Sequence, residues 1–97
     1  MFLKIHRSPG SGDIVAVCDR ELLNTTISNG TMKVPISEYF YGNCQVTEAE
    51  VQEAMKSAGN INLMGERAVS IAIGMGLITR SDCIMIGTVP HAIICRL

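Results

Sequence analysis

Aromatic residues are scarce in this sequence, which has two phenylalanines, two tyrosines and no tryptophan among its 97 residues. The core must therefore be built from aliphatic side chains. Hydrophobic residues make up 47% of the chain and charged residues 18%, a composition typical of a globular protein. A chain of this length forms a single domain, residues 1–97, and buries well over half of its unfolded surface without metal or disulfide support.

Long apolar segments are also missing. The longest weakly polar run, residues 68–78, is far shorter than the roughly 20 residues that a membrane helix needs. Charged residues recur among residues 1–7, where a secretory signal would have an apolar segment. We therefore expect a soluble protein that is not exported and has no membrane partner.

Closely spaced cysteines, which could hold zinc, are absent. The sequence has no Cys-x-x-Cys pair and no close histidine partner of the kind that a zinc site uses. Most of the cysteines lie in apolar runs, where a reduced cysteine behaves as a small hydrophobic residue. The sequence therefore predicts reduced thiols, no metal site and a cytoplasmic location. The cysteines are Cys18, Cys44, Cys83 and Cys95.

Cofactor motifs are missing too, since there is no phosphate-cradling glycine loop, dinucleotide fingerprint or metalloprotease motif. We therefore expect no cofactor. The net charge is −1, and residues 38–66 hold five glutamates against Lys56 alone. The two ends of the chain are mildly basic, but neither has the dense basic patch of a strong nucleic-acid binder.

The first part of the chain predicts strands. Residues 2–7 and 13–19 are two runs separated by a turn-rich break at residues 8–12, which indicates a β-hairpin. The second run is apolar on both faces and should be a central strand. A third strand is expected over residues 32–36, where Pro35 requires an edge or a bulge.

Residues 38–42 gather three of the four aromatic side chains. Two interpretations remain open for this segment. It is either a hydrophobic lid over the core or an exposed contact surface.

The best specified element is a helix that begins after Thr47. Thr47 and Glu50 have the spacing of a capping box, and Val46 and Val51 that of a hydrophobic staple. Apolar residues then recur at helical spacing until Gly59, which should end the helix.

A second helix is predicted from Leu63 to about Met75 and should end at Gly76. Only residues 60–62 separate it from the first helix, so the two are predicted to form a tight antiparallel hairpin.

Two closing strands are predicted over residues 83–87 and 91–97. The expected fold is therefore α+β, with a single mainly antiparallel sheet of about five strands and a two-helix hairpin packed on one face.

Two stretches carry a resemblance to a known family: Asn62 to Val69, and Gly87 to Ala92. Together with the opening strands, residues 38–42 and the last arginine, they resemble the archaeal domain-of-unknown-function family 424 over nearly the whole chain. The family has no established activity. The resemblance therefore implies an uncharacterised, archaeal-type cytosolic protein and an architecture, but no reaction.

The start of the second predicted helix is the first candidate site, formed by Asn62, Gly65, Glu66 and Arg67. Free backbone N–H groups and the helix dipole favour an anion there, and Arg67 could complete the site. The competing interpretation is structural: Glu66 caps the helix, and Gly65 allows close packing.

Pro90 and His91, in the predicted last hairpin, form the second candidate site. A neutral imidazole held in a short loop can act as base, acid or ligand. The competing interpretation is an ordinary loop histidine bonded to a backbone carbonyl, because no nucleophile or carboxylate is fixed beside it in the sequence.

The leading hypothesis is a non-enzymatic binding module that contacts RNA, a ribonucleoprotein or a protein partner through these two sites. One alternative is a small enzyme in which His91 acts as acid or base with Glu66 and Arg67. Another is a self-associating domain, a homodimer formed through the strand of Pro35 and the aromatic residues 39–41.

Overall fold

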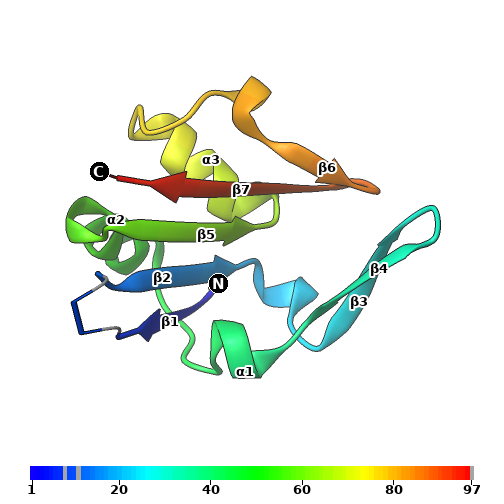
Figure 1. Cartoon of the computed structure of the whole chain (residues 1–97), viewed down its shortest axis with the longest axis horizontal. Helices are drawn as coiled ribbons and strands as arrows, with labels where there is room; N and C mark the ends of the chain where they lie inside the picture. The colour runs from blue at the N-terminus through cyan, green and yellow to red at the C-terminus, as the bar shows by residue number, and fades with distance from the viewer. Residues whose placement is uncertain (8, 11, 97) are drawn as a thin grey trace.

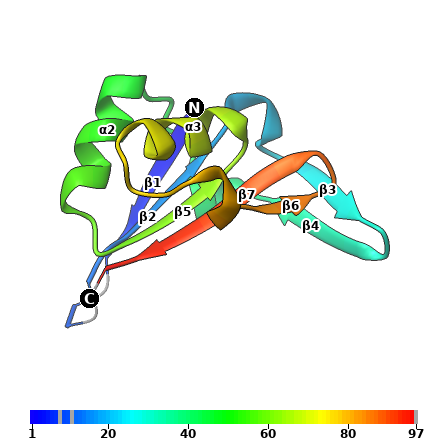
Figure 2. The same cartoon turned by 90° about the horizontal axis from the view of Figure 1, so that it is seen from above.

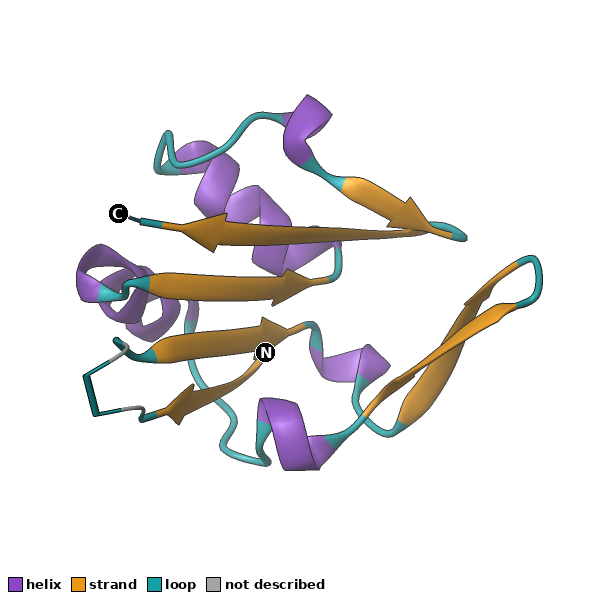
Figure 3. Ribbon diagram, in the orientation of Figure 1, coloured by secondary structure: helices purple, strands orange, loops and turns teal. Residues whose placement is uncertain are grey.

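The computed structural model describes residues 1–7, 9–10 and 12–96, and Figures 1 and 3 show its strands and helices. The strands are β1 (Phe2–His6), β2 (Ile14–Cys18), β3 (Thr25–Asn29), β4 (Met32–Ile36), β5 (Asn60–Met64), β6 (Ile84–Ile86) and β7 (Val89–Cys95). The helices are α1 (Glu38–Tyr41), α2 (Glu48–Ser57) and α3 (Glu66–Gly74), with short 3-10 turns at Arg20–Leu22 and Arg80–Asp82.

The α+β class and the opening hairpin are confirmed, but the sheet is mixed. Five strands lie in the order β1-β2-β5-β7-β6, and β2 and β5 run parallel. The other neighbouring pairs in this sheet are antiparallel. β3 and β4 form a second, two-stranded sheet, so the prediction of one mainly antiparallel sheet is wrong. Pro35 does lie at an edge, because β4 pairs with β3 alone.

The predicted two-helix hairpin does not form, because residues 60–64 are strand β5 between β2 and β7. Helix α3 consequently begins only at Glu66. Ile61 and Leu63 are buried, whereas Asn60 and Asn62 are half-buried, which is the two-residue alternation of a strand. Pairing with strands on both sides outweighs the helical pattern that continues into α3.

Helices α2 and α3 lie together on one side of the five-stranded sheet, as Figure 2 shows. Because β2 and β5 are parallel, the chain must cross over between them, and α2 lies in this connection. The core on the helix side is aliphatic, as predicted. Its members include Val15, Val17, Val51, Met55, Ile61, Leu63, Ala68, Val69, Ala72 and Ala92.

The opposite side of the sheet is covered over only part of its length. There α1 and the β3–β4 hairpin bury a second cluster that includes Ala16, Cys18, Ile36, Tyr41, Met64 and Ile86. The aromatic segment is thus a lid at Tyr41, which is buried, and at Phe40, which stacks on His6 with ring centroids 4.8 Å apart. Tyr39 is 84% exposed.

The capping box at the start of α2 is confirmed. The Glu50 N–H donates to Oγ1 of Thr47 at 3.2 Å, and the Thr47 N–H donates to Oε1 of Glu50 at 3.0 Å. The helix ends at Ser57, two residues before the predicted stop at Gly59. Its last carbonyl groups are bonded by Arg96, near the other end of the chain.

Gly76 terminates α3, as predicted, through a Schellman motif: the last helical residue is Gly74, and Met75 is the C-cap. Gly76 has a φ of +76°, its N–H donates to the carbonyl of Ile73, and the N–H of Leu77 donates to the carbonyl of Ala72.

Three positions of the predicted elements lie outside the described residues: Ser8 and Ser11 in the first turn, and Leu97 at the end of the last strand. Among the described residues, no helix is long and apolar enough to cross a membrane.

Candidate functional site

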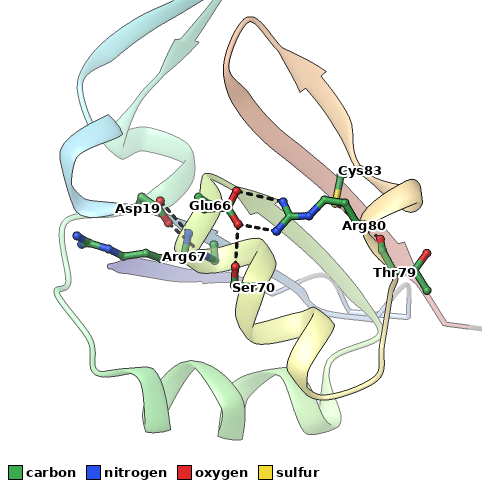
Figure 4. Close-up of polar contacts among 8 residues, drawn as sticks. Asp19, Glu66, Arg67, Ser70, Thr79, Arg80 and Cys83 are labelled. Carbon is green, nitrogen blue, oxygen red and sulfur yellow. Dashed lines mark hydrogen bonds and ion pairs between the residues drawn. The ribbon is translucent and has the colours of Figure 1, made fainter.

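Helix α3 begins where β2 and β5 end side by side. Because these strands are parallel, Asp19 after β2 lies beside Gly65 after β5, and the Asp19 N–H donates to the carbonyl of Met64 at 3.0 Å. The Asp19 carboxylate then reaches the first turn of α3, as Figure 4 shows. It accepts hydrogen bonds from the N–H groups of Arg67 at 3.0 Å and Ala68 at 2.9 Å.

Asp19 therefore fills the position in which an anion was expected. It is 3% exposed, and its negative charge satisfies the free N–H groups and the dipole of α3. Sequence reasoning missed this residue. An acidic residue directly after a buried strand was a usable signal, but only together with the parallel pairing of β2 and β5.

Gly65 is held tightly from two sides. Its φ is +112°, and a Cβ atom at this position would lie 2.6 Å from Oδ2 of Asp19. Its N–H donates to the carbonyl of Pro90 at 2.9 Å, while its own carbonyl accepts from the N–H of Val69 in α3. The structure thus brings Gly65 and Pro90 together as a backbone junction.

Glu66 lies between two partners on the outer surface of α3 (Figure 4). Arg80 donates to its two carboxylate oxygens at 3.1 and 2.7 Å, and Oγ of Ser70 donates at 2.8 Å. These bonds, that from Arg80 first, lower the pKa of Glu66. Arg67 in turn lies 3.6 Å from Glu21. Both charged candidates are therefore already engaged in exposed ion pairs.

Two shallow hollows flank these ion pairs. One, of about 250 Å³, is lined by Met1, Glu48, Glu66, Arg67, Ser70 and Ile71. The other, of about 150 Å³, lies between Gly65, Glu66 and the β6–β7 turn and includes Thr88 and Pro90. Acidic groups line both hollows, which disfavours a phosphate or another anion.

His91 and Asn62 lie on the opposite side of the sheet from Glu66 and Arg67. In β7, Ala92 belongs to the helix-side core, so the neighbouring His91 faces away from the helices. It is half-buried opposite Met64, and burial lowers its pKa, which favours the neutral imidazole. Asn62 accepts a 2.8 Å hydrogen bond from the Tyr41 hydroxyl. The predicted site residues are therefore divided between two faces.

This division places His91 and its expected partner groups Glu66 and Arg67 on different faces. A general acid or base must reach the same substrate as its partner groups. The sheet separates His91 from Glu66 and Arg67, and the two charged residues bind other side chains. Within the described residues, no three His, Cys, Asp or Glu side chains are placed to hold a metal ion.

Two isoleucines stand out on the face of His91 and Asn62. Ile84 of β6 is 69% exposed and pairs with His91, and Ile93 of β7 is 62% exposed and pairs with Asn62. We call these four residues the open-face patch. Sequence reasoning missed the two isoleucines, because an apolar run in a strand does not reveal whether both of its faces are covered.

Cys18 does not add a reactive group to this face of the sheet beside the lid. Cys18 is fully buried beside Tyr41, and burial raises the pKa of its thiol to about 11. The thiol is therefore protonated at neutral pH and packs as an apolar group. All four cysteines are free, while the cytoplasmic location expected from them stays a prediction.

Comparisons with known proteins give a family and a similar structure, but no activity. A family model described as "Protein of unknown function (DUF424)" matches residues 6–97. The crystal structure of an uncharacterized conserved protein from Methanopyrus kandleri is similar, with a TM-score of 0.79 and 27% sequence identity. The match covers 99% of this chain and 93% of that one. No curated protein matches the chain.

Proposed function

The chain belongs to the DUF424 family, whose function is unknown, and from its own geometry we propose that it is a non-enzymatic module that binds another protein through the open-face patch. The observation that carries this proposal is the exposure of Ile84 and Ile93, at 69% and 62%, on neighbouring strands. Full burial of an isoleucine side chain contributes about 1.5–3 kcal/mol. A partner that covers both would gain substantial apolar contact.

The surroundings of the patch favour a protein partner. Asn62 and His91 add polar groups beside the two isoleucines, and neither is an acid or a strong base. Protein interfaces have this character, with an apolar centre that is poor in charge and contains a few hydrogen-bonding groups. Both Asn62 and His91 were candidates from the sequence, and they keep a binding role here.

The basic residues do not favour RNA. Four of the eight lie beside a carboxylate of the chain, whose negative charge repels a phosphate backbone. Lys4 also donates to the carbonyl of Tyr39 and lies 5.3 Å from the centre of its ring. The ion pairs are Arg7–Asp13, Lys56–Glu53, Arg67–Glu21 and Arg80–Glu66, and Arg96 binds carbonyl groups of α2.

The proposal can be tested by affinity capture from an extract of the source organism, with nuclease present. The variants Ile84→Glu and Ile93→Glu place a charge in the patch. Met32→Glu is the matched control, because Met32 is 56% exposed and lies in β4, outside the patch. We expect a protein partner to be captured by the unmodified chain and by Met32→Glu, and to be lost with either patch variant.

Three outcomes would contradict the proposal. Capture that disappears with nuclease would indicate RNA or a ribonucleoprotein. Equal capture by the patch variants would place the binding surface elsewhere. A dimer in light scattering that only the patch variants dissociate would assign the patch to self-association instead of a different protein.

A further inference from the structure

Strand β1 forms one edge of the five-stranded sheet, and the described residues cover only the first half of that edge. Leu3 N–H donates to the carbonyl of Cys44 at 3.3 Å, and Val46 N–H donates to the carbonyl of Met1 at 2.9 Å. Phe2 and Gln45 thereby form an isolated antiparallel bridge. Residues 44–46 thus act as a short additional strand beside the beginning of β1.

The covering segment does not continue along Ile5. Gly42, with a φ of +73°, turns the chain toward the side chain of Lys4. Backbone groups alternate in direction along a strand, so the N–H and carbonyl of Ile5 point outward, as those of Leu3 do. Among the described residues, neither group of Ile5 has a hydrogen-bond partner on that side. The second half of the edge is open.

Helix α2 extends past this open edge. Glu50, Glu53, Ala54 and Ser57 form one stripe of the helix, while Val51 and Met55 on another face are buried. A groove of about 420 Å³ lies between the stripe and β1. Leu3, Ile5 and Val46 form its apolar floor, and Ile5 is 37% exposed. The stripe thus lies beside the position that an additional strand would take next to Ile5.

We propose that this groove binds an extended, basic segment of another protein, which adds to the sheet as a strand beside Ile5. The segment would form backbone hydrogen bonds with Ile5 and place alternate apolar side chains against Ile5 and Ala54. This binding site is separate from the open-face patch, on another part of the molecule.

The acidic side chains beside the groove determine which kind of segment can bind there. Glu50 uses Oε1 in the capping box, so its other carboxylate oxygen remains for a ligand. Glu53 pairs with Lys56 at 3.2 Å, but both side chains are mostly exposed and such a pair exchanges readily. Two carboxylates above an apolar floor suit a segment in which Lys or Arg alternates with apolar residues. They also repel the phosphates of a nucleic acid.

A peptide of eight residues that alternates valine with lysine tests the proposal, and the matched peptide of valine and glutamate is the control. Both are titrated into the isotope-labelled protein and followed by NMR. We expect saturable shifts at the amides of Ile5, Val46 and Ala54 with the lysine peptide. Hydrogen exchange at the Ile5 amide should become slower, because this N–H gains a partner.

Two charge-reversal variants on the same helix locate the interaction. Glu53→Lys should lower the affinity for the lysine peptide by about threefold to tenfold, as expected for the reversal of one exposed charge. Glu48→Lys makes the same change outside the groove and should alter the affinity by less than about twofold, because salt screens distant charges.

The proposal is overturned if the lysine peptide produces no shifts, if both peptides bind equally well, or if the shifts fall on the open-face patch. It is also overturned if the same amides shift on dilution of the protein alone, which would show that a second copy covers this edge. Unchanged exchange at Ile5 together with saturable binding would exclude strand addition.

Discussion

Gly65 and Asp19 fit together so closely that position 65 has no room for a side chain: a Cβ atom on Gly65 would lie 2.6 Å from Oδ2 of Asp19. The Asp19 carboxylate approaches over this glycine to bond two N–H groups of α3. The pair thus joins the end of β2 to the start of α3. Gly65 and the first turn of α3, which were a candidate binding site, therefore form an internal junction with Asp19.

We predict that Gly65→Ala lowers the free energy of unfolding by about 3 kcal/mol, from the strained backbone and the displaced carboxylate. The φ of +112° alone is unfavourable for alanine. Urea denaturation measures the effect. Gly74→Ala is the control: Gly74 is the last residue of α3, and a Cβ atom added there would meet nothing within 4 Å, so this change should be neutral or stabilising by up to about 1 kcal/mol. Equal changes in the free energy of unfolding for the two variants would contradict the close contact between Gly65 and Asp19.

Local sequence signals predicted much of the fold. The capping box at Thr47, the helix stop at Gly76 and the edge position of Pro35 each depend on residues a few positions apart. The physical cause lies within the segment in all three cases, so one sequence suffices to find it.

Features that depend on distant segments were not predictable in this way. Residues 60–64 became a strand because β2 and β7 pair with both of their edges. The parallel pairing of β2 and β5 in turn brings Asp19 to α3, 48 residues from Arg67. The exposure of Ile93 depends on how far α1 and the β3–β4 hairpin extend over the sheet. The sequence could therefore indicate individual candidate residues, but not which of them share one surface.

The half-buried His91 should make stability depend on pH. Burial lowers its folded-state pKa below the ordinary 6.5, so the unfolded chain takes up a proton first as the pH falls. The contribution of neutral His91 to the free energy of unfolding is fully present above pH 6.5. It declines as the pH drops toward the folded-state pKa and then levels off. Urea midpoints between about pH 8 and 5 measure this change. His91→Gln should remove this part of the pH dependence, and an NMR titration that gives a pKa above 6.5 would contradict it.

Glu66 should also make stability depend on pH, in a more acidic range than His91 does. Its pKa is lowered from 4.5, mainly by the hydrogen bonds from Arg80 and next by that from Ser70. Its contribution to stability is therefore present above 4.5 and is lost as the pH falls through the lowered value. NMR titration of the carboxylate should show that Arg80→Gln raises this pKa more than Ser70→Ala does. The reverse order would show that the ion pair in Figure 4 is weak in solution.

Arg96, which follows β7, should stabilise the C-terminal end of α2. Its Nη1 donates to the carbonyls of Met55, Lys56 and Ala58 at 2.9, 3.1 and 3.0 Å. Arg96→Ala should lower the free energy of unfolding by about 1–2 kcal/mol, because these carbonyls lose their donor. Arg96→Lys should restore part of the loss. Arg20→Ala is the control, since the Arg20 side chain bonds no group among the described residues; a similar loss there would point to a general charge effect.

Neighbouring isoleucines of β7 offer the sharpest test of the open-face patch in the free protein. Ile93 is 62% exposed, whereas Ile94 packs against the helix-side core. Ile93→Thr should therefore change the free energy of unfolding by less than about 0.5 kcal/mol, whereas Ile94→Thr should lower it by about 1–2 kcal/mol. Threonine keeps the branched shape that suits a strand, so the difference reports burial. A large loss with Ile93→Thr would mean that this side chain already has a partner within the chain, and the patch would then not be free to bind another protein.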